Sequence, residues 1–381
     1  MKLEILQENL NLGINTVCRV LTNRPQVAIL SNLLLVASPG NLEITASNLE
    51  TTVTVTVGAK VEEKGEFTVP GRTFQEIVSG LSAEKIDLEV KEGFLTLSGG
   101  KFKGKINGTP AAEFPKVLES LGNKKPTASW KLDKLSFSKV LNRLIFSAAT
   151  DDGRAVLTGI LFAGGKEELV LAAADGFRLS ADKISLEGKN NPEVKFIVPA
   201  KALLEVSRLL NESKGDKEEK EFALDYFEDK SEVIFDLGVV KIITRLIAGN
   251  FPDYEKIIPP DSSIKIVSTT EELAKAVKLA AVFARNSANI VKLRMANGKL
   301  RISANAPEVG ENETEVEVKI EKGESEELII AFNYRYLLDL FNNLGETEIT
   351  LEFNGPLASG IFKIPSAPNF LHLIMPVRVQ N

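Results

Sequence analysis

The sequence predicts an α+β protein of three similar domains, each with two helices packed on antiparallel sheets. The first observation is a repeat: FTVPGRTFQEIVSGL at 67–81 returns as FIVPAKALLEVSRLL at 196–210, and more loosely as LIIAFNYRYLLDLFNNL at 328–344. The second is that every copy passes from a short apolar segment into an amphipathic helix. The third is a length of 381 residues, which is too long for one core. A strand–helix unit recurring at domain-sized spacing indicates three domains.

The first repeat begins with a predicted helix. Apolar residues between positions 8 and 21 follow helical spacing, and the segment Thr22–Pro25 ends that pattern. Two runs of alternating or β-branched residues follow, at 29–47 and 51–57, and a Pro39–Gly40–Asn41 turn interrupts the first. The helix at 67–81 and further strands complete the unit.

The second and third repeats follow the same order. A helix is predicted at 133–150, with a hairpin after it at 156–175. In the third repeat Thr269 and Glu272 have capping-box spacing at the start of a helix that runs to Arg285. Asn297–Gly298 then predicts a two-residue hairpin turn. Polar, proline-bearing stretches near 123–128 and 259–263 predict domains at 1–123, 128–258 and 259–381.

Composition excludes several classes of protein. No apolar run approaches the roughly 20 residues of a membrane helix. Glu4 and Glu8 stand where a secretory signal would need an apolar core, so we expect a cytoplasmic protein. A single cysteine, Cys18, rules out an internal disulfide framework and is expected to be a buried apolar residue.

The sequence offers little material for catalysis. His372 is the only histidine, which leaves almost nothing for a Ser–His–Asp triad or a histidine metal site. The run 98–102 (SGGKF) lacks the residues of a phosphate loop and predicts a hairpin turn instead. Asp151 and Asp152 are explained by a turn at Gly153. We therefore predict no catalytic residue, no metal and no cofactor.

Charge is unevenly distributed between the predicted elements. The chain has a formal charge of −6, but the six predicted helices together carry +4 and the remainder −10. If helices and strands form separate layers, the helix side is basic and would attract phosphates without reading a base sequence. Lys and Arg are also common on exposed helices without any partner, so the charge count leaves both explanations open.

Five short motifs stand in order along the chain: Arg24–Pro25, VPGR at 69–72, ADGFRL at 174–179, FPDYEKIIP at 251–259 and LIMPVRV at 373–379. With the repeats, they resemble the bacterial DNA polymerase III β subunits, or sliding clamps, over the whole chain. The resemblance implies three clamp-type domains per chain and a head-to-tail dimeric ring around duplex DNA. It also implies a processivity factor without catalysis.

Partners and sites follow from the same resemblance. The implied partners are double-stranded DNA, the polymerase III α subunit, the clamp loader, and other polymerases and repair proteins that carry clamp-binding peptides. DNA-facing positions map onto Arg24, Arg72, Lys201, Asn333 and Tyr334. The contact between chains maps onto Ile106 against Val282 and Phe283, with Lys103 and Lys105 beside it, which need acidic partners.

The resemblance implies a mostly apolar groove that accepts a short peptide. Its residues map onto Leu157, Ala174, Gly176, Phe177, Arg178, Leu179, Pro252, Lys256, Ile257, Leu373, Ile374, Met375, Pro376, Val377 and Arg378. Taken singly, Leu179, Ile257 and Ile374 are better explained as core residues, and only the cluster as a whole indicates a groove. Phe177 replaces a histidine frequent in the family, Gly104 replaces an apolar residue of the dimer contact, and Gln380–Asn381 extends the usual end.

The alternative class of function is a repeat-built enzyme or a carbohydrate-binding module. Such a protein needs a convergent acid pair or an aromatic platform. Trp130 is the only tryptophan, and no acid cluster recurs between the copies. A solution mass of twice the chain mass would favour the ring.

Overall fold

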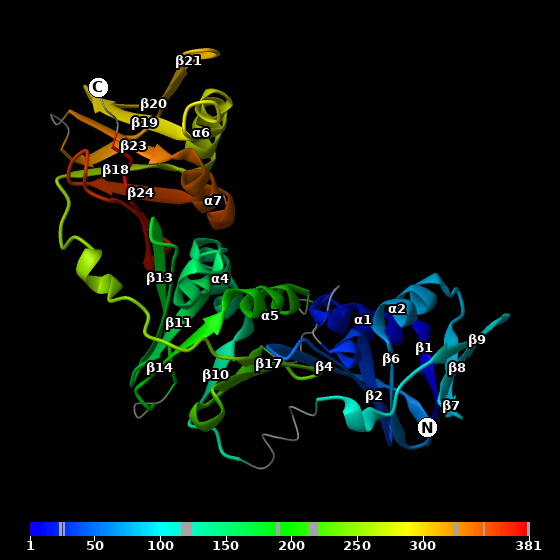
Figure 1. Ribbon diagram of the computed structural model, residues 1–381. Helices are drawn as coiled ribbons and strands as arrows, with labels where there is room; N and C mark the ends of the chain where they lie inside the picture. The colour runs from blue at the N-terminus through cyan, green and yellow to red at the C-terminus, as the bar shows by residue number, and fades with distance from the viewer. Residues whose placement is uncertain are drawn as a thin grey trace. The chain divides into compact units, whose positions relative to one another are not determined.

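The computed structural model describes residues 1–22, 25, 27–115, 124–187, 191–212, 220–323, 327–345 and 347–378. The chain forms two compact units: unit 1 contains Met1–Asp133 and Lys214–Leu246, and unit 2 contains Lys134–Ser213 and Ile247–Asn381. The second repeat is therefore divided between both units. Each unit is built from helices packed on antiparallel sheets, which confirms the predicted α+β class (Figure 1).

Unit 1 has two antiparallel sheets and two α-helices among its described residues. The helices are α1 (Gln7–Val17) and α2 (Gly71–Gly80). The five-stranded sheet has the order β5 (Lys60–Glu63), β1 (Lys2–Leu6), β7 (Lys85–Lys91), β8 (Phe94–Gly99), β9 (Phe102–Asn107). The eight-stranded sheet has the order β10 (Ala128–Asp133), β15 (Glu221–Phe227), β16 (Glu232–Asp236), β17 (Val240–Arg245), β4 (Thr51–Gly58), β3 (Asn41–Ser47), β2 (Asn32–Ser38), β6 (Gly65–Pro70).

Unit 2 contains α4 (Lys134–Leu144), α5 (Ala200–Glu212), α6 (Thr270–Ala284) and α7 (Tyr334–Leu344). Its nine-stranded sheet has the order β14 (Val194–Pro199), β11 (Gly159–Gly164), β12 (Glu168–Ala174), β13 (Arg178–Ser185), β26 (Ala367–Ile374), β25 (Gly360–Ile364), β24 (Glu348–Phe353), β18 (Ile264–Thr269), β22 (Lys319–Lys322). The four-stranded sheet has the order β21 (Gly310–Val316), β20 (Lys299–Ala306), β19 (Ile290–Ala296), β23 (Leu328–Asn333).

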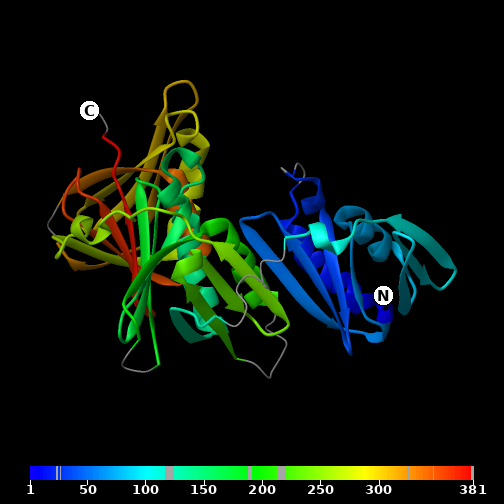
Figure 2. The same cartoon turned by 60° about the horizontal axis from the view of Figure 1, so that its bottom comes forward.

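Both large sheets continue from one repeat into the next. Strand β4 of the first repeat pairs with β17 of the second, and β13 of the second pairs with β26 of the third. Figure 2 shows the second junction as a green strand beside a red one. Strand β21 of the third repeat corresponds to β4 and β13, and strand β9 of the first repeat corresponds to β17 and β26. Both β21 and β9 lie at sheet edges and have a neighbour on one side only among the described residues.

Local predictions agree with the structure in most details. The repeat helices form where the apolar spacing predicts them, although α1 and α4 end in short 3₁₀ turns instead of continuing as α-helix. The Thr269 hydroxyl accepts a hydrogen bond from the Glu272 N–H at 3.3 Å, as the capping spacing predicts. Asn297 and Gly298 both have positive φ, as a tight hairpin turn requires.

Predictions about burial and turns also hold. Gly100 forms the turn between β8 and β9. This is the hairpin turn predicted for the run 98–102, which lacks the residues of a phosphate loop. Cys18 is buried, and burial raises the pKa of its thiol to about 11. No helix of the described residues has the length and apolar character needed to cross a membrane. The exact domain boundaries remain predictions, and Asn123 lies outside the described residues.

The helices pack in pairs, one pair per repeat: α1 with α2, α4 with α5, and α6 with α7. Each pair buries an apolar face. In the third repeat, Leu273 and Val277 of α6 and Leu340 of α7 are fully buried with the inward residues of the surrounding strands. The pairing leaves polar residues along the outer side of each helix pair.

Candidate functional site

The loop between β12 and β13 is held by one aspartate. The Asp175 carboxylate accepts hydrogen bonds from the backbone N–H groups of Phe177 and Arg178, at 2.8 and 3.0 Å. Gly176 has a φ of 91°, a conformation that glycine adopts without steric cost. A side chain at Gly176 would also collide with the Arg154 guanidinium, which donates to the Asp175 carbonyl at 2.9 Å. This turn presents Phe177 at the surface.

The strands beside the loop place part of the predicted groove in the protein core. In the β13–β26 pairing, Leu179 lies opposite Leu373 and Arg178 opposite Ile374. Leu179, Leu373 and Ile374 are buried, so the core explanation holds for Leu179 and Ile374. Phe251 and Tyr254 pack on the cluster that contains Leu179 and Leu373.

Three predicted apolar residues are exposed. Phe177 is 55% exposed, Ile257 45% and Met375 41%, so the core explanation does not hold for Ile257. The Phe177 ring stacks on Tyr336, with ring centroids 6.3 Å apart. Tyr336 lies on α7 and has no place in the sequence motifs, so sequence reasoning missed it. Exposed apolar side chains of this kind are typical anchors for a partner peptide.

Arg178, which the resemblance assigns to the groove, is bound by groups of its own chain. Its guanidinium forms ion pairs with Asp175 at 3.0 Å and with Asp339 at 2.7 Å. It also lies over the rings of Tyr336 and Phe146, 4.7 and 5.5 Å from their centroids. Only 9% of the side chain is exposed. Arg178 therefore fixes the loop and α7 together, and is not available to a ligand's charge.

The segment after β26 is held by two backbone hydrogen bonds, one to the loop of Phe177 and one to β23. The Met375 N–H donates to the Phe177 carbonyl and the Val377 N–H to the Ala331 carbonyl, both at 2.8 Å. Lys256 is 80% exposed and pairs with Asp253 at 2.7 Å, and Arg378 is exposed. The remaining groove candidates are divided between buried, half-buried and exposed positions: Leu157, Ala174, Pro376 and Pro252.

The candidates for DNA contact share a position in the fold. Arg72 and Lys201 are both exposed and both stand second in their helices, α2 and α5. The same position in α7 belongs to Arg335, also exposed. Sequence reasoning missed Arg335, although alignment of the three repeat helices identifies it. Arg24 lies outside the described residues.

Asn333 and Tyr334 have local structural roles. The Asn333 side chain caps α7 by accepting from the Arg335 N–H at 3.0 Å. Tyr334 is half-buried against the core of the third repeat. Neither side chain presents a free charge, which makes Arg335 the stronger candidate in this helix.

The predicted contact between chains needs a correction. Lys103, Lys105 and Ile106 lie on the edge strand β9, but Ile106 is 5% exposed because its own unit buries it. The apolar surface of this edge comes instead from Phe102, 38% exposed. A side chain at Gly104 would stand 2.8 Å from the Phe102 ring, so this ring occupies the space that Gly104 leaves.

On the other side of the predicted contact, Val282 is 48% exposed at the end of α6. Phe283 next to it packs partly on the core of the third repeat. Val282 is therefore the residue of this pair that offers apolar surface to a partner.

The summed net positive charge of the six helices is smaller than the sequence count predicts. With the observed bounds, α4 carries +3, α1 carries −1 and the other four helices are neutral. The sum falls from +4 to +2, because Arg19 and Arg285 lie beyond helix ends and Glu212 lies within α5, while Asp133 belongs to β10 and not to α4. Arg143 of α4 is also paired with Asp182, at 2.8 Å. Any attraction for phosphate must depend on individual cations.

No group of three or more metal-binding side chains comes together in the part of the chain that the structure describes. The described sites thus consist of an apolar surface on unit 2, exposed cations at helix starts, and strand edges.

Family comparison covers nearly the whole chain. Three domain models of the DNA polymerase III beta subunit match it: the N-terminal domain at residues 1–118, the central domain at 131–253 and the C-terminal domain at 255–378. The beta sliding clamp of Bacillus subtilis is 29% identical over 99% of this chain and 100% of its own length. That of Pseudomonas aeruginosa is 28% identical, with both chains fully covered.

Solved structures agree with the sequence comparison. The DNA polymerase III subunit beta of Pseudomonas aeruginosa superimposes with a TM-score of 0.90, at 27% identity and full coverage of both chains. The beta subunit of Thermotoga maritima gives a TM-score of 0.88, also at 27% identity and full coverage. The fold, the order of the motifs and the match of all three domain models lead to one conclusion: the chain belongs to the DNA polymerase III beta subunit family.

Proposed function

We propose that this chain is a DNA sliding clamp: two copies close head to tail around duplex DNA and hold a replicative polymerase on it. It acts as a processivity factor and performs no catalysis, in keeping with its family. The observation that carries the proposal is that β9 and β21 are both edge strands, each with a neighbour on one side only among the described residues. Such edges usually pair or are protected, because they expose unsatisfied backbone groups.

The two edges are equivalent to strands that already pair within the chain. Strand β21 corresponds to β4 and β13, and β9 corresponds to β17 and β26. A third junction of the same type, formed between two copies, would use both edges. Such a heterologous contact closes into a ring when the rotation between copies fits.

The charges of the two edges support this pairing. On β9, Lys103 and Lys105 lie on one face. On β21, Glu311, Glu313 and Glu315 lie on one face, although they also contact Asn305, Arg301 and Lys299 of their own sheet. Lysines on one edge and glutamates on the other favour pairing of unlike edges over like ones.

Affinity for DNA would come from enclosure and from phosphate contacts by Arg72, Lys201 and Arg335, without reading of the base sequence. The exposed side chains of Phe177, Ile257 and Met375 would receive apolar anchors of partner peptides. The partners are the polymerase III α subunit, the clamp loader, and other polymerases and repair proteins. Since the role requires chromosomal DNA, we place the protein in the cytoplasm.

Retention on circular DNA tests the proposal. The protein is loaded by a clamp loader onto nicked circular duplex, and the bound fraction is measured by gel filtration before and after one double-strand cut. A clamp stays on the circle and is lost from the linear product. Equal retention on both forms would contradict encirclement.

Charge reversal tests the ring contact separately. Lys103→Glu with Lys105→Glu should convert the dimer to a monomer in light scattering, because both edges are then acidic. Adding Glu311→Lys and Glu313→Lys should restore the dimer. A monomeric wild-type chain, or no response to either change, would reject this pairing of edges.

A further inference from the structure

The three helix pairs differ in how their outer sides are joined. In the first two repeats, hydrogen bonds between side chains bridge the helices at two levels. The bridges are Asn15–Gln75 (2.7 Å) and Asn11–Ser79 (2.8 Å) between α1 and α2, and Asn142–Ser207 (2.8 Å) and Ser138–Asn211 (3.0 Å) between α4 and α5.

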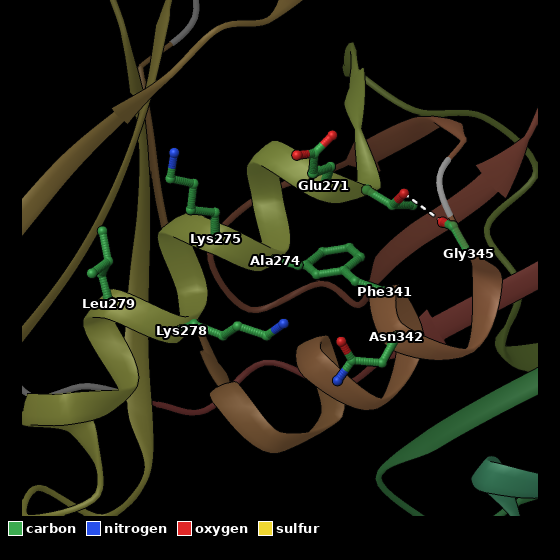
Figure 3. A pocket seen from close by; sticks show the side chains of 9 residues that line it. Glu271, Ala274, Lys275, Lys278, Leu279, Phe341, Asn342 and Gly345 are labelled. Atoms are coloured by element: carbon green, nitrogen blue, oxygen red, sulfur yellow. Dashed lines mark hydrogen bonds between the residues drawn. The ribbon is translucent and has the colours of Figure 1, made fainter.

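The third pair has lost both bridges. Counted from the helix starts, Ala274 and Lys278 of α6 stand where α4 has Ser138 and Asn142. Phe341 of α7 and Gly345, directly after α7, stand where α5 has Ser207 and Asn211. An Ala–Gly pair cannot hydrogen-bond through its side chains. The hydrogen bond at this end runs instead from the Thr270 hydroxyl to the Gly345 carbonyl, at 2.6 Å (Figure 3).

The missing bridges leave a groove between α6 and α7. It has a volume of about 560 Å³ and is lined by both helices. Figure 3 shows Lys278 extending from α6 across the groove toward Asn342 of α7, with the Phe341 ring between the helices. Phe341 is buried and forms an apolar floor.

The groove carries cations without partners. Lys275 and Lys278 are exposed, and neither forms an ion pair with any residue that the structure describes. One carboxylate, Glu271, also lines the groove. It lies seven residues before Lys278, about 10 Å along the helix axis, so the end of the groove at Lys278 is cationic.

We infer that this groove holds a backbone phosphate of the enclosed duplex, with Lys278 as the main contact. Lys278 supplies the positive charge, the Asn342 amide can donate a hydrogen bond, and Lys275 adds charge from the preceding turn. The inference rests on the proposed function, because it needs duplex DNA at the helix side of unit 2. It makes the third repeat bind DNA differently from the other two.

A duplex is the occupant that the site favours over a free anion. The groove is wide and open, and it has one strong cationic end instead of a closed ring of donors. A single ion in such a site would remain mostly hydrated, whereas a polyanion is already held there by the ring. The contact also adds to the release of counterions from DNA.

Lys278→Gln tests the inference through the salt dependence of binding. The dimer is titrated with a short duplex at several salt concentrations, and the slope of log K against log [salt] is determined. Each lost phosphate contact should reduce the slope by about one. Lys278→Arg should keep the wild-type slope, and Asn342→Asp should weaken binding because it places a carboxylate beside the phosphate.

Lys292→Gln is the matched control. Lys292 is equally exposed and lies on β19, where the alternate residues Val291 and Leu293 are buried, so it projects from the opposite face of that sheet. The control should leave the slope unchanged. An unchanged slope in Lys278→Gln, or equal changes in both variants, would overturn the inference.

The phosphate site and the proposed clamp function can be rejected separately. If wild-type protein is retained on circular DNA but Lys278→Gln behaves as wild type in the salt titration, the clamp stands and the phosphate site falls. If wild-type protein is not retained on circles, the proposed function itself falls. Inorganic phosphate added at the same ionic strength should compete only weakly, and strong competition would assign the groove to a small anion instead.

Discussion

The two junctions between repeats have the same backbone and different side chains. At the first junction, Asn48 accepts hydrogen bonds from the N–H groups of the residues two and three positions on, as Asp175 does at the second. The Glu50 carbonyl accepts from the Arg245 N–H at 2.9 Å, and the Phe177 carbonyl from the Met375 N–H at 2.8 Å.

The strand registers are also equivalent. Thr51 pairs with Thr244 at the first junction, and Arg178 pairs with Ile374 at the corresponding place in the second. The outermost pair is Glu50 with Arg245 in one case and Phe177 with Met375 in the other. One backbone design therefore presents a charged surface once and an apolar surface once.

This difference indicates that the proposed peptide site is specified by a few side chains and not by the fold of the junction. The first junction has the loop, the strand pairing and the connecting hydrogen bonds, but no exposed aromatic residue at this place.

The largest effect is expected from giving the second junction the residues of the first. Phe177→Glu with Met375→Arg removes two exposed apolar anchors, each worth about 2 kcal/mol or more at an interface. Affinity for a polymerase-derived peptide should fall at least 100-fold in a calorimetric titration. The fold should persist, because the same backbone already carries these residues at the first junction.

The reciprocal exchange at the first junction is the control. Glu50→Phe with Arg245→Met should leave the affinity of the peptide for the second junction unchanged. Two results would contradict a peptide site at the second junction. One is loss of binding in this control, and the other is wild-type affinity in the Phe177→Glu, Met375→Arg variant.

Gly176→Ala should have the next largest effect. The methyl group of an alanine at this position would collide with the Arg154 guanidinium, and the alanine would have to adopt a positive φ. We therefore expect a loss of about 1–3 kcal/mol in the free energy of unfolding. Leu49 occupies the equivalent turn position at a φ of 74°, and its side chain is 36% exposed. Leu49→Ala should change stability by much less in the same denaturant titration.

His372 should make the second junction sensitive to pH between about 6.5 and 5. It is buried, its Nδ1 lies 2.7 Å from the Ser180 hydroxyl, and the first junction has Ile242 at the equivalent place. Burial, followed by the charge of Arg178, lowers the pKa of His372 well below 6.5. Below about pH 6.5 the unfolded chain therefore binds a proton that the folded chain does not.

Stability should accordingly fall as the pH drops through 6.5, by up to about 1.4 kcal/mol per pH unit for this group. His372→Gln removes the titration and should flatten the dependence between about pH 6.5 and 5, measured by denaturant unfolding. His372 is the only histidine, so the difference between the two curves isolates it. Parallel curves would contradict the assignment.

The smallest effect is expected at the hydroxyl pair of the first junction. Thr51 and Thr244 hydroxyls lie 3.3 Å apart in a buried position. Replacing both by valine removes both partners together and keeps the shape, which costs little compared with leaving one unsatisfied. The double variant should lie within about 1 kcal/mol of wild type. Thr244→Val alone should be less stable than the double, because it leaves the buried Thr51 hydroxyl without this partner, whereas in Thr51→Val the Thr244 hydroxyl keeps the Glu50 carbonyl at 3.2 Å.

Sequence determined the repeats because their signals are local. Apolar spacing, the capping threonine and the Asn297–Gly298 turn act within one helix or one hairpin, and the structure shows each where the pattern predicts it. The family motifs likewise identified the loop of Phe177 and the segment of Met375 as neighbours.

Tertiary structure decided which of those residues are available. Arg178 is held by two carboxylates and two rings, and Ile106 is buried in its own unit. Tyr336 joins the surface from α7, and the α6–α7 groove is lined by a small residue on α6, Ala274, and another directly after α7, Gly345. Strand partners such as Thr51 and Thr244 are almost 200 residues apart, and no local pattern specifies such a pairing, because it depends on the packing of the whole sheet.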